Sequence, residues 1–228
     1  MSVDSKAVST LAGAVTALAL LLTPSAHAGD APAVREATLQ DVRSFARAKG
    51  MKILTFAGYS GAGYEDPAAM LGAADRVLEG YDPARTLVNI GATAEGIGAV
   101  YEVARRRGFV TIGIVSTLAR DEQVPLSPSV DYVFYVRDAT WGGRVPGSTR
   151  LAPTSAAIVG SSSAIVGIGG GEIARDEMLA ARRAGKAVTF IPADMNHQLA
   201  RDKAARKDAP EPTDFRGAAH AAFAPRQD

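Results

Sequence analysis

A run of three glycines between an apolar segment and a polar one constrains this chain more than any other feature. Residues 163–168 are almost entirely apolar, and Gly169, Gly170 and Gly171 follow them directly. Residues 172–184 are rich in Ala, Glu, Arg and Met, which favour a helix. A helix that begins at glycines leaves its first backbone N–H groups free, and such groups bind anions. The pattern therefore predicts a strand–turn–helix unit that can hold a phosphate.

Strands and helices alternate along the chain from residue 35 onward. The expected strands are apolar at nearly every residue, which indicates burial on both faces, as in a parallel sheet covered by helices. Alternating units of this kind form an open, doubly wound, Rossmann-like α/β sheet, here within a single domain. Asp66 and Pro67 have the residue types that begin a helix. The expected strands are residues 52–57, 86–90, 109–115, 132–136, 164–168 and 187–191, and the expected helices are residues 36–49, 66–79, 95–107, 154–161 and 172–184.

Three loops at one edge of this sheet are rich in glycine. Ligands of such sheets bind outside the carboxyl ends of the strands, and glycine lets a ligand approach the backbone closely. We therefore expect a ligand at this edge; the alternative is that the glycines serve only tight turns and helix–sheet packing. The fingerprint of dinucleotide-binding proteins is not met, because no acidic residue closes the second strand. The expected ligand-binding residues are Gly58, Ser60, Gly61, Gly91, Thr93, Gly96, Gly169, Gly170, Gly171 and Arg175.

Four segments and one glutamate occur in an order that is typical of a known family: residues 58–61, 87–100, 113–115 and 169–171, and Glu177. In this order the chain resembles the lysine-decarboxylase-like family over roughly residues 51–192. Members of that family include cytokinin-activating (LOG-type) nucleoside 5′-monophosphate phosphoribohydrolases, and the wider superfamily includes DNA-processing proteins of the DprA/Smf type. The resemblance implies a Rossmann-like fold, often dimeric, in which glycines hold a phosphate and a glutamate acts near the ribose.

The family signature, Pro-Gly-Gly-x-Gly-Thr-x-x-Glu, is only partly kept. The positions that match it are Gly170, Gly171 and Glu177. The positions that depart from it are Gly169 in place of the proline, Ile173 in place of the later glycine and Ala174 in place of the threonine. Thr154 stands where the resemblance implies an arginine in the hydrolytic members, and Arg144 and Arg150 can replace that arginine only along a different backbone path.

Few side chains in this chain suit acid–base chemistry. Glu177 is the candidate catalytic residue, because it alone among the acids keeps its place in the signature; the alternative is an ordinary surface acid. Glu172 is interpreted as a helix-start residue that complements the helix dipole. His197 has no second histidine at metal-binding spacing and is interpreted as structural, so no metal or cofactor is expected. Trp141 is a candidate for stacking on a base or, equally, a packing residue.

The first 28 residues have the pattern of a secretory signal peptide. Residues 7–22 are apolar apart from Ser and Thr, and Ala26 and Ala28 frame a cleavage site before Gly29. The expected location is therefore periplasmic or secreted; the rival interpretation is translation from Met51 and a cytoplasmic protein. The expected division is a signal peptide (1–28), an N-terminal helix (29–50), a Rossmann-like nucleotide-binding domain (51–200) and a polar C-terminal tail (201–228).

Composition narrows the functions further. The chain has no cysteine, which excludes disulfides, thiolate metal sites and a cysteine nucleophile. Its net charge is +1, so no strong attraction to nucleic acid or membrane is expected, and the basic stretch 201–207 is interpreted as a solvated helix face. The sequence predicts a protein that binds or senses a nucleotide or nucleotide sugar. The alternative is a phosphoribohydrolase that cleaves an N-glycosidic bond, and the resemblance adds a possible homodimer.

Overall fold

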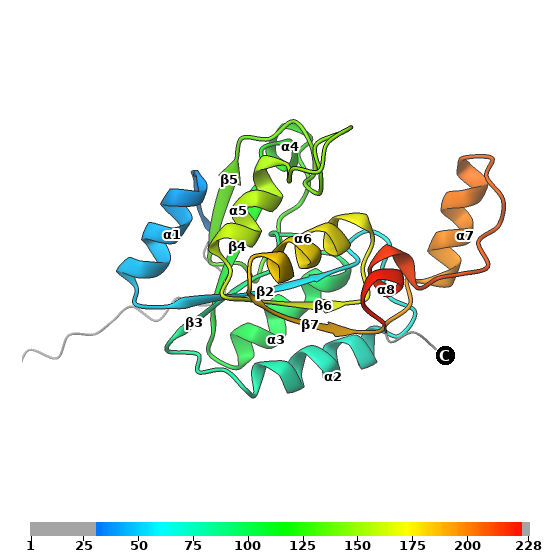
Figure 1. The fold of residues 1–228 in the computed structure, drawn as a ribbon. Coiled ribbons are helices and arrows are strands. Elements are labelled where there is room, and N and C mark those ends of the chain that lie inside the picture. The colour runs from blue at the N-terminus through cyan, green and yellow to red at the C-terminus, as the bar shows by residue number, and fades with distance from the viewer. Residues whose placement is uncertain (1–30, 225–228) are drawn as a thin grey trace, which may run out of the picture.

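Seven parallel strands form one sheet at the centre of the protein (Figure 1). The computed structural model describes residues 31–224. The order across the sheet is β1-β5-β4-β3-β2-β6-β7. The strands are β1 (Ala33–Glu36), β2 (Lys52–Gly58), β3 (Thr86–Asn89), β4 (Val110–Ser116), β5 (Tyr132–Val136), β6 (Ala164–Ile168) and β7 (Ala187–Ile191). The predicted open, Rossmann-like α/β sheet is confirmed.

The direction in which the chain crosses the sheet reverses at β2. The chain steps from β2 through β3 and β4 to β5 on one side, and then crosses to β6 on the other side of β2. Gly58, the last residue of β2, lies opposite Ile168, the last residue of β6. Open α/β sheets place their ligand crevice outside the carboxyl ends of the strands at such a reversal. The ends of β2 and β6 therefore mark the edge where a ligand is expected.

Helices cover both faces of the sheet (Figure 1). One face carries α1 (Leu39–Ala48), α5 (Pro153–Ser161) and α6 (Glu172–Arg183), and the other carries α2 (Pro67–Leu78) and α3 (Val100–Arg106). Two short helices, η1 (Gly96–Ala99) and α4 (Leu118–Asp121), lie in the loops after β3 and β4.

Strand β2 shows why most residues of the strands are apolar. Leu54 and Phe56 belong to the core cluster that contains the buried residues of α2 and α3. Ile53 belongs to the cluster that contains residues of α1 and α5. Since alternate side chains enter cores on opposite faces, both sets are mainly apolar, and the buried Thr55 is hydrogen-bonded to Ser162 and Asn89.

The start of α2 follows the predicted chemistry. The Asp66 carboxylate accepts a hydrogen bond from the backbone N–H of Ala69 at 2.8 Å, and Pro67 occupies the first turn. Helix α1 begins in a similar way, with a capping box in which Thr38 and Asp41 each accept from the other's backbone N–H. These caps satisfy N–H groups that have no partner within the helix.

The N-terminal segment contains a strand that the sequence analysis does not predict. Within the segment 29–50 the helix expected at residues 36–49 is present as α1, but β1 precedes it and pairs in parallel with β5 at the edge of the sheet. This strand is four residues long, exposed throughout, and reads Ala-Val-Arg-Glu. It lacks the apolar run that identifies the other strands, so its sequence gives no signal for it.

The expected polar tail contains two helices, α7 (His197–Arg206) and α8 (Gly217–Phe223). Helix α7 has no buried residue and projects from the body of the protein, which suits the solvated face expected for residues 201–207 (Figure 1). Helix α8 instead packs onto α6, where Ala219 and Phe223 join the cluster that contains Met178. The expected signal peptide, residues 1–28, lies outside the described residues. Within residues 31–224, no helix is both long and apolar enough to span a bilayer.

Candidate ligand-binding site

The glycine-rich loops meet at the carboxyl edge of the sheet, as predicted. The backbone N–H of Ile97 donates to the carbonyl of Tyr59 at 2.7 Å, which joins the loop after β3 to the loop after β2. A side chain at Gly96 would collide with the carbonyl oxygens of Tyr59 and Ser60. Gly61 faces the carboxylate of Glu95 in the same pair of loops. The structure thus brings Gly58, Ser60, Gly61 and Gly96 together.

The other glycine-loop residues lie beside these. Gly91 has a φ of +70° in the loop after β3, and the Thr93 hydroxyl accepts a hydrogen bond from the backbone N–H of Glu95 at 3.2 Å. Gly169 and Gly170 have φ of +56° and +122°, which favour glycine, and both are buried in the turn after β6.

Two tyrosines pack against the carboxyl ends of β2 and β6. The Tyr64 hydroxyl donates to the carbonyl of Ile168 at 2.7 Å and accepts from the backbone N–H of Tyr59 at 3.1 Å. A side chain at Gly58 would collide with that hydroxyl, and one at Gly169 would meet the ring of Tyr59 at 2.5 Å. Burial raises the pKa of the Tyr59 phenol above its usual value, so the hydroxyl is neutral. These contacts are packing contacts, the alternative that the sequence analysis leaves open for the glycines.

The C-terminal helix α8 covers the first part of the glycine turn. The backbone N–H of Ala219 donates to the carbonyl of Gly170 at 3.0 Å. The Tyr59 hydroxyl donates to the carbonyl of Arg216 at 2.6 Å, just before the helix. Ala219 is fully buried against the turn. Only the last glycine, Gly171, therefore remains partly open at the start of α6.

The start of α6 is uncapped. Gly171 is the N-cap residue, it forms no side-chain capping bond, and no atom lies within 4 Å of where its Cβ would be. The first backbone N–H groups of an α-helix have no partner within the helix and carry the positive end of its dipole. The first turn of α6 therefore has the character of an anion site.

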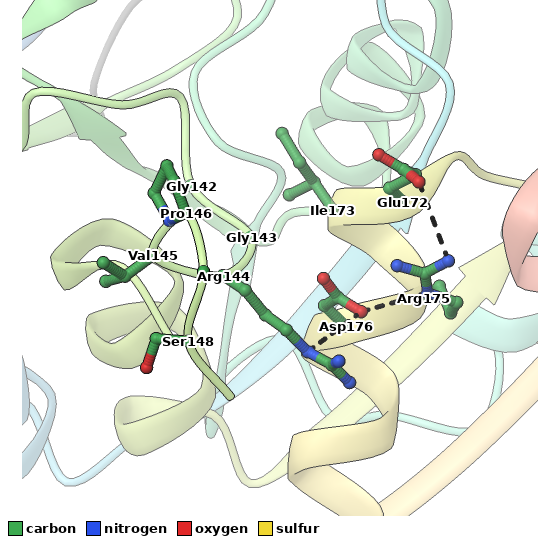
Figure 2. Close-up of a pocket in the computed structure, with 11 residues that line it drawn as sticks. Gly142, Gly143, Arg144, Val145, Pro146, Ser148, Glu172, Ile173, Arg175 and Asp176 are labelled. Carbon is green, nitrogen blue, oxygen red and sulfur yellow. Dashed lines mark hydrogen bonds and ion pairs between the residues drawn. The ribbon is translucent and has the colours of Figure 1, made fainter. Parts of the chain in front are cut away.

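An open cavity of about 290 Å³ adjoins this turn (Figure 2). Its two walls are the loop between β5 and α5 and the first turns of α6. Figure 2 shows Arg144 reaching from the loop towards Asp176, and Arg175 lying between Glu172 and Asp176. The cavity is lined by residues 142–148 of the loop and by Glu172, Ile173, Arg175 and Asp176 of the helix.

The Asp176 carboxylate holds both arginines in the cavity wall. It lies 3.5 Å from Nε of Arg144 and 3.0 Å from Nε of Arg175, and its side chain is only 5 % exposed. Arg175 also lies 3.8 Å from the largely exposed carboxylate of Glu172. The lining therefore carries two cations and two anions, so its net charge is zero. Guanidinium groups can bind phosphate or carboxylate in a fixed geometry.

Glu177, the candidate catalytic residue, does not line the cavity. It lies on the side of α6 that packs against α5, where it is 5 % exposed. The Ser155 hydroxyl donates to Oε1 of Glu177 at 2.6 Å and accepts from the backbone N–H of Gly143 at 2.7 Å. Burial raises the pKa of the Glu177 carboxyl to about 7; the Ser155 hydrogen bond opposes this rise and the charge of Asp176 adds to it. Glu177 is therefore connected to the cavity wall through Ser155.

A second carboxylate fixes the base of the cavity loop. The Asp138 carboxylate accepts from the backbone N–H of Thr140 at 2.9 Å and from the backbone N–H of Thr154 at 2.8 Å. Burial opposes the ionisation of Asp138, but these hydrogen bonds outweigh it and lower the pKa of the carboxyl. Thr154 occupies the position where the resemblance implies an arginine. It is buried at the start of α5, and its side chain carries no charge.

An exposed apolar side chain lines the cavity. Ile173 of α6 is 39 % exposed and belongs to the lining, and Trp141, which directly precedes the loop wall in the sequence, is 45 % exposed. The two walls touch here, because Cβ atoms added at Gly142 and Gly143 would lie 3.6 Å and 3.3 Å from the Ile173 side chain. Exposed apolar side chains beside cationic groups suit a ligand that has an aromatic part and an anionic part.

The remaining candidates lie elsewhere. Arg150 is in the same loop but does not line the cavity. The His197 ring stacks on Phe215 at 4.0 Å and lies beside Asp194 and Glu65, so its contacts are of the structural kind expected for it. In the part of the chain that is described, no group of three or more His, Cys, Asp and Glu side chains could hold a metal ion.

Sequence reasoning missed the residues that organise the site: Tyr59, Tyr64, Asp138, Ser155 and Asp176. Asp176 is adjacent to Glu177 and was available as a second acid beside the signature. Ser155 and Glu177 lie on different helices, 22 residues apart, and no local pattern connects them. Asp138 follows the end of β5, where polar residues at the edge of a parallel sheet are a usable signal.

Several solved structures share part of this fold. The TM1055 protein, a structural-genomics target, has a TM-score of 0.44 and 20 % identity over 60 % of this chain and 72 % of its own. The molybdenum cofactor binding protein of the phototrophic bacterium Rippkaea orientalis has a TM-score of 0.45 and 18 % identity over 61 % and 76 %. DNA processing protein A of Streptococcus pneumoniae has a TM-score of 0.40 and 14 % identity over 73 % and 60 %.

The Rossmann-like sheet that the resemblance implies is present. No protein-family profile and no curated protein matches the sequence. A likeness of this size concerns the fold and carries no information about the ligand of this chain.

Proposed function

We propose that this protein binds a small phosphorylated ligand, a nucleotide or nucleotide sugar, in the cavity between the β5–α5 loop and α6. The observation that carries the proposal is the pairing of two positioned arginines with an uncapped helix start at one open cavity. Arg144 and Arg175 are both held by Asp176, and the first turn of α6 begins beside them at Gly171. Backbone N–H groups at a helix start and guanidinium groups both bind phosphate well.

The rest of the cavity suits the rest of such a ligand. Ile173 lines the cavity and the exposed Trp141 directly precedes its loop wall, and a base can pack against these apolar side chains. Asp176 and Glu172 are acceptors for sugar or base donors, and their charges prevent the cavity from attracting anions indiscriminately. The neutral lining favours moderate affinity and geometric selectivity, which are the properties of a sensing or carrier protein.

A phosphoribohydrolase is the second candidate, and one observation favours it. General acid–base catalysis works best when the pKa of the catalytic group is near the working pH, and burial raises the pKa of Glu177 to about 7. However, Ser155 and the loop lie between Glu177 and the cavity. Catalysis by Glu177 would require the loop to move aside, and the departures at Ile173, Ala174 and Thr154 remove groups that the hydrolytic signature contains. We therefore place binding first.

The test is a thermal-shift screen with nucleoside mono- and diphosphates, nucleotide sugars and inorganic phosphate, followed by calorimetry on each ligand that stabilises the protein. Arg144→Gln is expected to weaken binding tenfold or more, about 1.4 kcal/mol, because a hydrogen bond to a charged group is lost. Arg150→Gln, in the same loop but outside the cavity, is the matched control and should bind as the wild type does.

Two outcomes would contradict the proposal. No stabilisation by any phosphorylated ligand would remove the binding function, and equal affinities of the wild type and Arg144→Gln would place the ligand elsewhere. Incubation of the wild type with each bound nucleotide, with chromatography of the released base, separates the two candidates. Release of base would favour the hydrolase, and binding without release would favour the sensing or carrier protein.

A further inference from the structure

One wall of the cavity is held by a buried line of hydrogen bonds. The backbone N–H of Gly143 donates to Oγ of Ser155 at 2.7 Å, and the Ser155 hydroxyl donates to Oε1 of Glu177 at 2.6 Å. Ser155 is completely buried. Gly142 also lies against Ser155, because a Cβ at that position would be 2.7 Å from Oγ. The loop therefore contacts the body of the protein closely at this serine.

One member of this chain of hydrogen bonds, Glu177, is ionisable. The Ser155 oxygen accepts from Gly143 while its single proton goes to Glu177. An ionised carboxylate accepts such a hydrogen bond strongly, whereas a neutral carboxyl accepts it more weakly. The strength with which Ser155 is oriented thus depends on the charge of Glu177.

We propose that Glu177, acting through Ser155, is a positioning residue that sets the place of the loop 140–148 and with it the shape of the cavity, and that the loop moves when the carboxyl gains or loses its proton. Glu177 is on this account not the catalytic residue that the sequence suggests. The consequence for a ligand rests on the proposed function, but the movement of the loop does not.

The surroundings of Glu177 bring the titration of its carboxyl close to neutral pH. Burial raises its pKa to about 7, with the neighbouring charge of Asp176 adding to the rise. The elements packed against α6 carry few charges: α5, β6 and β7 have no titratable side chain, and α8 contributes only His220, whose ring packs edge-on against Phe190. On the loop, Arg144 is the cation that faces this helix, through Asp176.

The direction of the movement follows from the strength of the hydrogen bond to Ser155. Above neutral pH, the ionised Glu177 holds the Ser155 hydroxyl strongly, and Ser155 in turn holds the backbone N–H of Gly143, which keeps the loop against α5 and α6. Below neutral pH, the carboxyl is neutral and the loop is held less tightly. The cavity is therefore better formed at mildly alkaline pH than at mildly acidic pH.

Trp141 provides a direct readout without any ligand. It is the only tryptophan in the chain and directly precedes Gly142 in the loop. In the purified protein, its fluorescence emission and anisotropy are expected to change between pH 5.5 and pH 8.5 with a midpoint near 7. Glu177→Gln is expected to abolish this transition, and Ser155→Ala is expected to abolish it by breaking the connection while leaving Glu177 in place. Circular dichroism at each pH shows that the variants are folded.

Matched controls separate positioning from general effects. Ser161→Ala removes a hydroxyl from the other end of α5, where it donates to the carbonyl of Ala157, and Glu102→Gln removes an exposed carboxylate from α3. Both should keep the wild-type transition, as should His220→Gln. A flat profile in the folded wild type, or a transition that persists in Glu177→Gln or in Ser155→Ala, would overturn the proposal. None of these results depends on the identity of the ligand, so they stand apart from a failure of the proposed function.

Discussion

Replacing Glu177 by glutamine is expected to remove a pH dependence of stability that the wild-type protein owes to this one side chain. Burial raises the pKa of the carboxyl from its usual 4.5 to about 7 in the folded protein. The folded state then binds the proton more tightly than the unfolded chain does. At 1.36 kcal/mol for each pKa unit, a rise of about 2.5 units corresponds to about 3 kcal/mol.

The sign follows from proton binding in the two states. Below the unfolded pKa both states are protonated, and this contribution to stability is fully present. As the pH rises from about 4.5 to about 7, the unfolded chain loses the proton first, so the free energy of unfolding falls; above 7 the loss is complete. The glutamine side chain of the variant has the same shape as the glutamate and never ionises.

Urea unfolding of the wild type and Glu177→Gln at a series of pH values measures the effect. The difference between their free energies of unfolding cancels the titration of all other groups. We expect this difference to shift by about 3 kcal/mol in favour of the variant between pH 4 and pH 8, with most of the change between pH 5 and pH 7. A difference that stays constant over this range would show that Glu177 titrates normally and would refute the reasoning from its burial.

Three further predictions concern the glycine turn, the crevice and the N-terminus. Gly170→Ala should lower the free energy of unfolding by about 1–3 kcal/mol, because Gly170 has a φ of +122° and a Cβ there would lie 2.6 Å from that of Ala174. Gly171 has open space around it, so Gly171→Ala should unfold as the wild type does in the same urea titration. The same variant should lose ligand affinity in calorimetry. Tyr64→Phe should destabilise the protein by about 1–3 kcal/mol, because two buried backbone groups lose their partner, whereas Tyr81→Phe, a partly exposed control, should change the urea midpoint little. Mass spectrometry of protein recovered from the expressing cell should find a chain that begins at Gly29; an intact Met1 or a start at Met51 would contradict the predicted signal peptide.

The fold was predictable because burial leaves a strong mark on sequence. Each strand from β2 to β6 packs under helices on both faces, and its apolar run follows from that. Strand β1 could not be predicted in this way, because it is short and exposed and is stabilised by its pairing with β5 rather than by apolar burial. Helix α8 could not be predicted either, because its small residues allow close contact with Gly170 and give no amphipathic pattern.

The site was less predictable, because glycine serves two purposes that look alike in sequence. A glycine that lets a ligand approach and a glycine that lets a tyrosine approach have the same sequence signal. The tyrosine contacts at Gly58 and Gly169 become visible only when the loops are placed side by side. The same limit applies to Glu177: its position in the helix could be predicted, but the Ser155 hydroxyl that determines its surroundings comes from another helix.

Strand β1 also protects the protein from association with itself. Its partner, β5, reads Tyr-Val-Phe-Tyr-Val, a segment of high β propensity without charge or proline, which is the composition of aggregation-prone strands. The exposed, partly charged β1 occupies the edge that β5 would otherwise present. A chain that began at Met51 would lack β1 and α1 and would leave the backbone N–H and C=O groups of β5 free to pair with another molecule. The segment that follows the expected cleavage site thus covers the β5 side of the sheet.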